Sequence, residues 1–228
     1  MRTILRSLLV CAVFVSVVAA AEVANAREAG LLTNVTGNVF YGKDKEKAEP
    51  FMKAKIDDVF YLEDGATMHI VYFKNGRKEK WTGAVEVTIT EEIGNASTEN
   101  EPAVTTEPGT STDGLRAIPE FLANLNTEIM GGKISRSHKK AYNSFNDLTD
   151  DEKKSVGDTK QVYIDMLKTA APDDITPELF SIGMLSQHKL YLETLGLVNV
   201  ALKKQPEHIG LKLVKSSLEK IIKDNEDL

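Results

Sequence analysis

The hydrophobic pattern of this chain changes across residues 95–114. Before this segment, apolar residues tend to recur at every second position, as in β-strands, and after it they recur every three or four positions, as in helices. The segment reads NASTENEPAVTTEPGTSTDG, with Val104 as its only large aliphatic residue. Such a stretch buries too little apolar surface to offset the entropy of ordering it, so a disordered, solvated linker is expected. The sequence therefore predicts an α+β chain in separate modules: a small β domain (27–94), a Thr/Glu/Pro-rich linker (95–114) and an α-helical domain (115–228).

The first 26 residues have the three parts of a secretory signal peptide. Arg2 and Arg6 form the basic end, residues 4–21 the apolar stretch, and Ala24-Asn25-Ala26 a small-residue cleavage site. We expect export with cleavage near Ala26, or alternatively after residue 20 or 21. A retained membrane anchor is disfavoured, because the apolar run is at the short end for spanning a bilayer.

The single cysteine, Cys11, lies inside this predicted signal. The exported chain then has neither disulfides nor a thiol nucleophile, which favours a bacterial periplasm, with secretion as the alternative. Removing Arg2, Arg6 and Glu22 from the 28 basic and 34 acidic residues leaves 26 against 33, a net charge of −7. The sequence after residue 26 contains no dense basic cluster, which argues against a nucleic-acid partner. It also contains no second apolar run that approaches membrane-spanning length.

Strand signals dominate residues 27–94. Residues 31–41 are rich in β-branched and aromatic side chains around Gly37-Asn38, which predicts two strands joined or kinked there. Residues 59–62 and 67–73 predict two more, the latter with Met68, Ile70 and Tyr72 on one face. Asn75-Gly76 predicts a hairpin with a type I′ turn, returning through residues 77–81, and a sixth strand covers 84–90. About six short strands imply a small barrel or sandwich.

In this module, glycines and alternating strand segments follow one another in a fixed order. The residues concerned are Gly37, Val39, residues 59–65, Met68, Ile70, Tyr72, Gly76 and Gly83. This order resembles the FecR-type β-domain, which occurs in bacterial envelope proteins with sensing or interaction roles. The resemblance implies the fold of the module only. The chain departs from the usual form at Asp57-Asp58, where Gly-Asp is expected.

Helical spacing takes over after the linker. A first helix is predicted from Leu115 to a stop at Gly131-Gly132, and a short one over residues 137–146. Thr149 and Glu152 form a capping box that opens a third helix. Thr176-Pro177 starts another that runs to Lys204, and residues 205–207 connect it to a last helix. This predicts an all-α bundle, or a helical-repeat-like domain, of four to five helices.

Residues 183–213 place Tyr191, Ala201-Leu202 and Pro206 in an order that resembles a tetratricopeptide unit. Only one unit is visible, whereas such repeats are stable in arrays, so an ordinary bundle with a proline turn is an equal alternative. In either case, we expect this module to act as a docking surface and not as a reaction site.

The only candidate binding residues surround the sole tryptophan. Trp81 follows Arg77, Lys78 and Lys80, so it could stack on a sugar or peptide at the hairpin edge. The competing interpretation places Trp81 in the core, as is common for strand tryptophans.

The motifs of known reaction and cofactor sites are missing from the sequence. His69, His138, His188 and His208 have no zinc spacing, and the acidic pairs at 57–58, 150–152 and 173–174 lack the layout of a calcium loop. No catalytic residue, metal ligand or cofactor site is predicted. We therefore expect an exported non-enzymatic envelope protein that acts as a binding, scaffold or sensing module for a protein or cell-wall component. The alternatives are a glycan- or peptidoglycan-binding protein using Trp81, and an unrecognised hydrolase.

Overall fold

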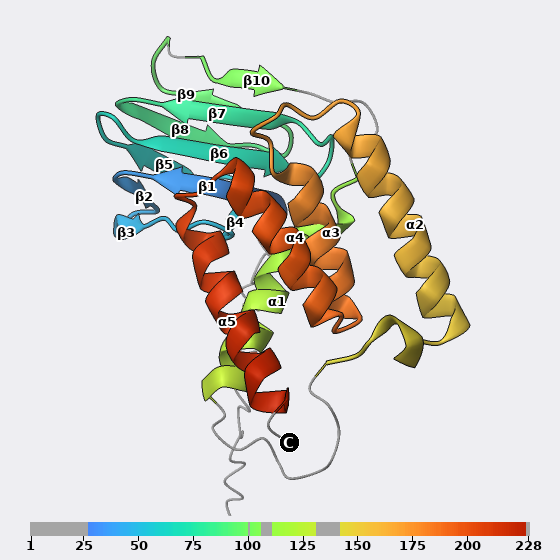
Figure 1. Ribbon diagram of the computed structural model, residues 1–228. Coiled ribbons are helices and arrows are strands. Elements are labelled where there is room, and N and C mark those ends of the chain that lie inside the picture. Colours follow the sequence, from blue (N-terminus) through green and yellow to red (C-terminus); the bar gives the residue numbers. More distant parts are fainter. Residues whose placement is uncertain (1–26, 100, 106–110, 131–141, 227–228) are drawn as a thin grey trace, which may run out of the picture.

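The computed structural model describes residues 27–99, 101–105, 111–130 and 142–226, and within these ranges a β region precedes five α-helices (Figure 1). The predicted α+β class, with strands first and helices second, is confirmed. The predicted signal peptide (1–26), the predicted helix stop at Gly131-Gly132 and residues 137–141 of the predicted short helix lie outside the described residues. In the other half of that short helix, residues 142–146, only the 3₁₀ turn that begins at Phe145 is helical.

The β region consists of two five-stranded antiparallel sheets. The first has the order β10-β7-β6-β1-β4 and the second the order β3-β2-β5-β8-β9. The strands are β1 (Glu28–Thr36), β2 (Val39–Tyr41), β3 (Glu46–Lys47), β4 (Lys53–Lys55), β5 (Val59–Leu62), β6 (Thr67–Tyr72), β7 (Lys78–Thr82), β8 (Val85–Ile89), β9 (Gly94–Ala96) and β10 (Ala103–Thr105).

The predicted alternation of β6 determines which side chains fill the space between the sheets. Met68, Ile70 and Tyr72 point into this β core, together with Trp81 from β7 and Phe60 from β5. The break between β1 and β2 falls at Gly37, whose φ of +76° suits glycine. The alternating sequence therefore builds the predicted small sandwich around one apolar core.

The β6–β7 hairpin forms where predicted, but its turn is not type I′. That turn needs positive φ at both central residues, whereas Gly76 has φ +66° and Asn75 is absent from the positive-φ residues. Tyr72 instead accepts from the Gly76 N–H and donates its own N–H to Arg77 O, which closes a four-residue loop. The Asn75 side chain stabilises this loop by accepting from the Arg77 N–H at 3.0 Å.

The helices are α1 (Asp113–Met130), α2 (Asp150–Leu167), α3 (Thr176–Gln187), α4 (Tyr191–Lys204) and α5 (Ile209–Glu226), with a short 3₁₀ turn at Phe145–Asp147. The predicted capping box is confirmed, since Thr149 N–H donates to Glu152 Oε2 at 2.8 Å and Thr149 Oγ1 accepts from Glu152 N–H at 3.3 Å. The predicted single helix from 176 to 204 is wrong. It ends at Gln187 and restarts at Tyr191, because Lys189 has φ +54°.

The described part of the segment 95–114 contains strands that its composition does not predict. Within its described part, β9 pairs with β8 and β10 pairs with β7, so the segment adds an edge strand to each sheet. The Thr112 hydroxyl then donates to Phe73 O at 2.9 Å. Backbone pairing to open sheet edges orders these residues although few of their side chains are apolar.

The β region and the helices share a second hydrophobic core. Leu31, Phe51, Val71 and Phe73 from the β region pack with apolar residues of α1, α3, α4 and α5. Strand β1 is consequently buried on both faces, with Leu31 toward the helices and Leu32 toward the β core. Figure 1 shows the sheet of β1, β6 and β7 lying against the near ends of α3, α4 and α5, with α2 outside α3. The modules are therefore distinct in secondary structure but packed face to face.

Candidate functional site

Trp81 does not offer an open stacking surface. Its side chain is only 2 % exposed and packs in the β core, and Nε1 donates to Glu79 Oε2 at 3.0 Å. A sugar stacks on an exposed ring face, so the interpretation of Trp81 as a binding platform needs correction: in this structure the ring is a core residue.

The three basic residues near Trp81 also fail to form one site. Arg77 Nε lies 2.7 Å from Glu79 Oε1, and Lys78 Nζ lies 2.5 Å from Asp174 Oδ2. Lys80 is exposed. Arg77 therefore pairs within the β region, Lys78 pairs with the helical module, and Lys80 lies at the surface. The three cations do not converge on a common ligand.

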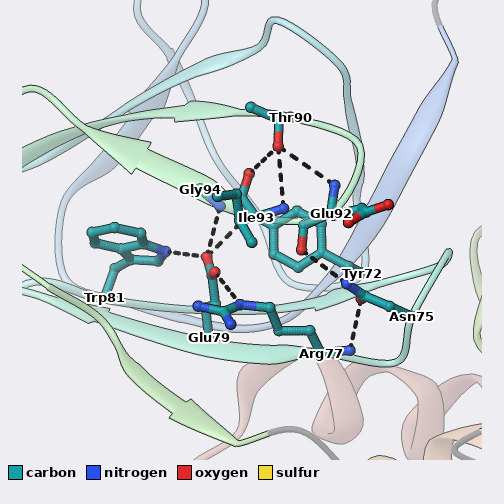
Figure 2. Close-up of polar contacts among 9 residues, drawn as sticks. All are labelled: Tyr72, Asn75, Arg77, Glu79, Trp81, Thr90, Glu92, Ile93 and Gly94. Atoms are coloured by element: carbon teal, nitrogen blue, oxygen red, sulfur yellow. Dashed lines mark hydrogen bonds and ion pairs between the residues drawn. The ribbon is translucent and has the colours of Figure 1, made fainter.

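Glu79 is the polar centre of the β region. Although it is only 1 % exposed, it accepts from Arg77 Nε, from Tyr72 Oη at 3.1 Å, from Trp81 Nε1 and from Gly94 N–H at 3.0 Å (Figure 2). Burial and the negative charge of Glu79 raise the pKa of Tyr72. Through these donors the carboxylate links β7, β6 and the start of β9. Because protein groups already occupy its oxygens, it is not open to a ligand.

Sequence reasoning missed Glu79, although a signal for it exists. In a strand, residues two apart point to the same side, so a buried Trp81 places Glu79 inside as well. The burial of a carboxylate then requires charged or hydrogen-bonding partners, which Arg77, also two residues away, supplies.

A second buried carboxylate lies in the helical layer. Glu178 of α3 is completely buried and pairs with Lys204 Nζ of α4 at 2.9 Å, while Tyr163 Oη of α2 donates to it at 3.1 Å. Burial, followed by the charge of Glu178, raises the pKa of Tyr163 to about 12. Lys204 also donates to Asp174 O at 2.9 Å, so one ammonium ties α4 to the start of α3.

Asp174 extends these contacts to the β region. Its carboxylate holds Lys78 of β7 and accepts from Thr176 N–H at 2.8 Å and from Thr176 Oγ1 at 2.6 Å. Burial alone would raise the pKa of Asp174, but the hydrogen bonds from Lys78 and Thr176 outweigh it and lower the pKa. Asp174 therefore stays charged at neutral pH and joins the two modules electrostatically.

A broad hollow follows the junction of the two modules, and we call it the seam groove. It has a volume of about 940 Å³ and is bounded by β1, the 47–50 loop, His69 and Lys80 on one side, and by Asp173 and residues 204–210 with Leu213 on the other. Its helical wall carries Ile209 and Leu213, which are 65 % and 64 % exposed. No other large hydrophobic side chain in the described residues is as exposed.

Two histidines face the seam groove in the neutral form at pH 7. Burial, reinforced by the positive charge of Lys80, lowers the pKa of His69 to about 4. Burial also lowers the pKa of His208, whose ring stacks on Phe51 with centroids 5.1 Å apart. Neither lies in a metal-ligand cluster: the described residues contain no group of three or more His, Cys, Asp or Glu able to hold a metal ion.

Among the described helices, none combines the length and the apolar character that crossing a membrane requires. Comparison with protein-family models, with curated proteins and with solved structures gave no match. The FecR-type and tetratricopeptide-like resemblances therefore stay expectations from the sequence, and the seam groove, which only the three-dimensional structure reveals, is the candidate site.

Proposed function

We propose that this protein is an exported, non-enzymatic bacterial envelope protein that binds a segment of another protein in the seam groove. The observation that carries the proposal is the pair Ile209 and Leu213, which stands exposed on one wall of a groove built from both modules. Exposed apolar side chains that gather in a concave surface are typical of interaction sites.

The chemistry of the two walls favours a short, extended peptide as the bound segment. Ile209 and Leu213 are four residues apart in α5 and so lie on one helix face, where they can receive apolar side chains. The opposite wall includes Asn34, Thr36 and Asn38. Asn34 Nδ2 donates to Gln205 at 3.4 Å and Asn38 Nδ2 donates to Glu63 at 2.8 Å, and the remaining hydrogen-bonding capacity of the three side chains can pair with a peptide backbone.

The hydrogen bonds of the buried acidic groups favour binding over catalysis. Glu79 and Glu178, the two buried carboxylates, are each surrounded by donors from the protein. A general acid or base needs a free position from which to reach a substrate, and these side chains have none.

Export rests on the signal-like residues 1–26, and cell fractionation tests it. We expect the protein in the periplasmic fraction with its mature N-terminus near residue 27. Accumulation in the cytoplasm with residues 1–26 retained would contradict this part of the proposal.

Site-specific photo-crosslinking in the native host tests the groove. A photoreactive residue at Glu49 or Lys80, both exposed groove positions, should capture a discrete partner, whereas one at exposed Lys160 of α2 should not. The double variant Ile209→Ser/Leu213→Ser should lose the product at least tenfold. Its matched control is Ile164→Ser/Leu167→Ser, which removes two 40 % exposed apolar residues from α2 and should retain the product. Equal capture by both double variants would exclude the groove as the binding site.

A further inference from the structure

His208 joins the start of α5 to strand β1. The residue precedes α5, and its carbonyl accepts the first helical hydrogen bond, from Lys212 N–H at 3.1 Å. Its Nδ1 accepts from Leu211 N–H at 3.1 Å, as an N-cap side chain does. Its Nε2 lies 2.7 Å from Thr33 O of β1.

These two contacts fix the tautomer of the ring. Because Nδ1 accepts from an amide, it carries no proton, so the proton must sit on Nε2 and be donated to the Thr33 carbonyl. Only the neutral ring with hydrogen on Nε2 makes both bonds. A single imidazole therefore caps α5 and fastens it to the β region at the same time.

We propose that His208 is a proton-sensitive latch, and that its protonation releases the first turn of α5 from β1 and opens the seam groove. A proton on Nδ1 would point at the Leu211 N–H, so a donor would face a donor and the cap would be lost. The resulting cation would also lie at the positive end of the α5 dipole.

The surroundings of the ring make the charged form costly. The side chain is 3 % exposed, stacks on Phe51 and has two backbone groups as its hydrogen-bond partners. Burial accordingly lowers its pKa below the ordinary value of 6.5. An opened latch would return the ring to water, so the open state binds the proton more strongly than the closed one.

The charged and titratable groups around the latch come from every neighbouring element. They are His69 of β6, Lys80 of β7, Glu49 of the 47–50 loop, Asp173 before α3, Lys204 of α4, and Glu207 and Lys212 beside His208 itself. Lys204 is engaged by Glu178, and Glu207 by Lys212 at 2.8 Å. Below about pH 5 a proton on His69 would add a second positive charge to the groove and favour opening further.

The latch is local, because other contacts hold the modules together. The shared hydrophobic core, the Lys78–Asp174 ion pair and the bond from Thr112 to Phe73 do not involve His208. Opening should therefore free residues near 208–213 and leave the rest folded. The inference stands whether or not the seam groove binds a partner.

Nuclear magnetic resonance of the ¹⁵N-labelled protein tests the latch directly. At pH 7.5 we expect His208 to carry its proton on Nε2. Between pH 6.5 and the folded-state pKa of His208, the protection of the Leu211 and Lys212 amides should fall by up to about tenfold per pH unit, after correction for intrinsic exchange. Amides of β6 exchange through global unfolding, so their protection should follow the free energy of unfolding measured by urea and stay above that of Leu211 and Lys212.

Three variants separate the latch from its neighbours. His208→Asn keeps a cap acceptor but cannot take up a proton near pH 6, so its Leu211 protection should not depend on pH. His69→Asn should weaken the response only below about pH 5, and His188→Asn, at the end of α3, should leave it intact. A Nδ1–H tautomer, a His208 pKa above 6.5, or an unchanged pH response in His208→Asn would each overturn the proposal. The first two readouts use the wild-type protein, so they decide the matter even if His208→Asn folds poorly.

Discussion

Gly114 in α1 and Gly183 in α3 lie so close together that neither position has room for a side chain. A Cβ on Gly183 would lie 1.8 Å from Gly114 O, and a Cβ on Gly114 would lie 2.0 Å from Phe180 O. The obstructing atoms are backbone and cannot turn aside. These two glycines therefore set the distance at which α1 crosses α3.

Gly183→Ala should consequently lower the free energy of unfolding by about 3 kcal/mol, at the upper end of the usual cost of overpacking. The matched control is Gly196→Ala in α4, where a Cβ meets nothing within 4 Å. That change should stabilise the protein by up to about 1 kcal/mol, because alanine favours helix more than glycine. Urea unfolding measures both values, and equal effects would contradict the close crossing.

Glu79→Gln should destabilise the β region by about 3 kcal/mol. The substitution leaves Arg77 without its carboxylate partner and turns an acceptor of four hydrogen bonds into an amide that itself brings donors. Glu86→Gln, at an exposed position of β8, is the control and should change stability by less than about 0.5 kcal/mol. Trp81 emission during urea unfolding reports the β core, since Trp81 is the sole tryptophan. A cost below 1 kcal/mol for Glu79→Gln would refute the central role of this carboxylate.

Stability should fall as the pH drops below 6.5. The folded-state pKa values of His69 and His208 lie below their ordinary value, so the unfolded chain takes up protons first and acid favours unfolding. For His69 the loss begins near pH 6.5 and ends near pH 4, and it amounts to at most about 3.5 kcal/mol at about 1.4 kcal/mol per pKa unit.

Urea midpoints measured between pH 7.5 and pH 4 check this dependence. His69→Gln should flatten the curve between pH 6.5 and 4, while His188→Gln should keep most of its slope. Identical curves for wild type and His69→Gln would show that His69 does not titrate as the structure requires.

Glycans should not reach Trp81. Its buried ring should give blue-shifted emission that acrylamide quenches weakly, and soluble peptidoglycan fragments should leave the spectrum unchanged. A shift or quenching on addition of those fragments would revive the glycan-binding interpretation. Trp81→Phe, which keeps an apolar ring but loses the bond to Glu79, should affect stability without affecting any envelope partner.

Cutting the chain between β10 and α1 should not separate its halves. The shared core and the Lys78–Asp174 ion pair hold the modules together without the connecting backbone. After limited proteolysis, the two fragments should co-elute in native buffer during gel filtration and part only in denaturant. Separation in native buffer would support independent modules on a flexible linker instead.

The sequence predicted most of the regular structure because local patterns determine it. The alternation of Met68, Ile70 and Tyr72 identified the inner face of β6, and the Thr149–Glu152 capping box identified the start of α2. The break at Lys189 had no such signal, since neither glycine nor proline stands at residues 188–190. There, tertiary packing overrides the helical pattern.

The packing of the modules and the candidate site were not predicted. Val71, on the second face of β6, and Phe73, directly after β6, are apolar too, which is a sign that another layer covers this end of the strand. The composition of residues 95–114 suggested a solvated linker instead. The seam groove combines residues far apart in the chain, such as Asn34 and Gln205, whose side chains lie 3.4 Å apart. No spacing in the sequence brings such residues together.

The burial of β1 on both faces has a consequence for how this chain folds. Thr33, near the start of the described chain, bonds to His208, 175 residues later, and Leu31 packs with the last helices. The first described strand therefore stays partly uncovered until the final helix has been synthesised. Contacts of such long sequence separation slow folding and leave an apolar strand exposed meanwhile. The order of the elements thus makes β1 a segment that a chaperone for apolar chain would recognise during that interval.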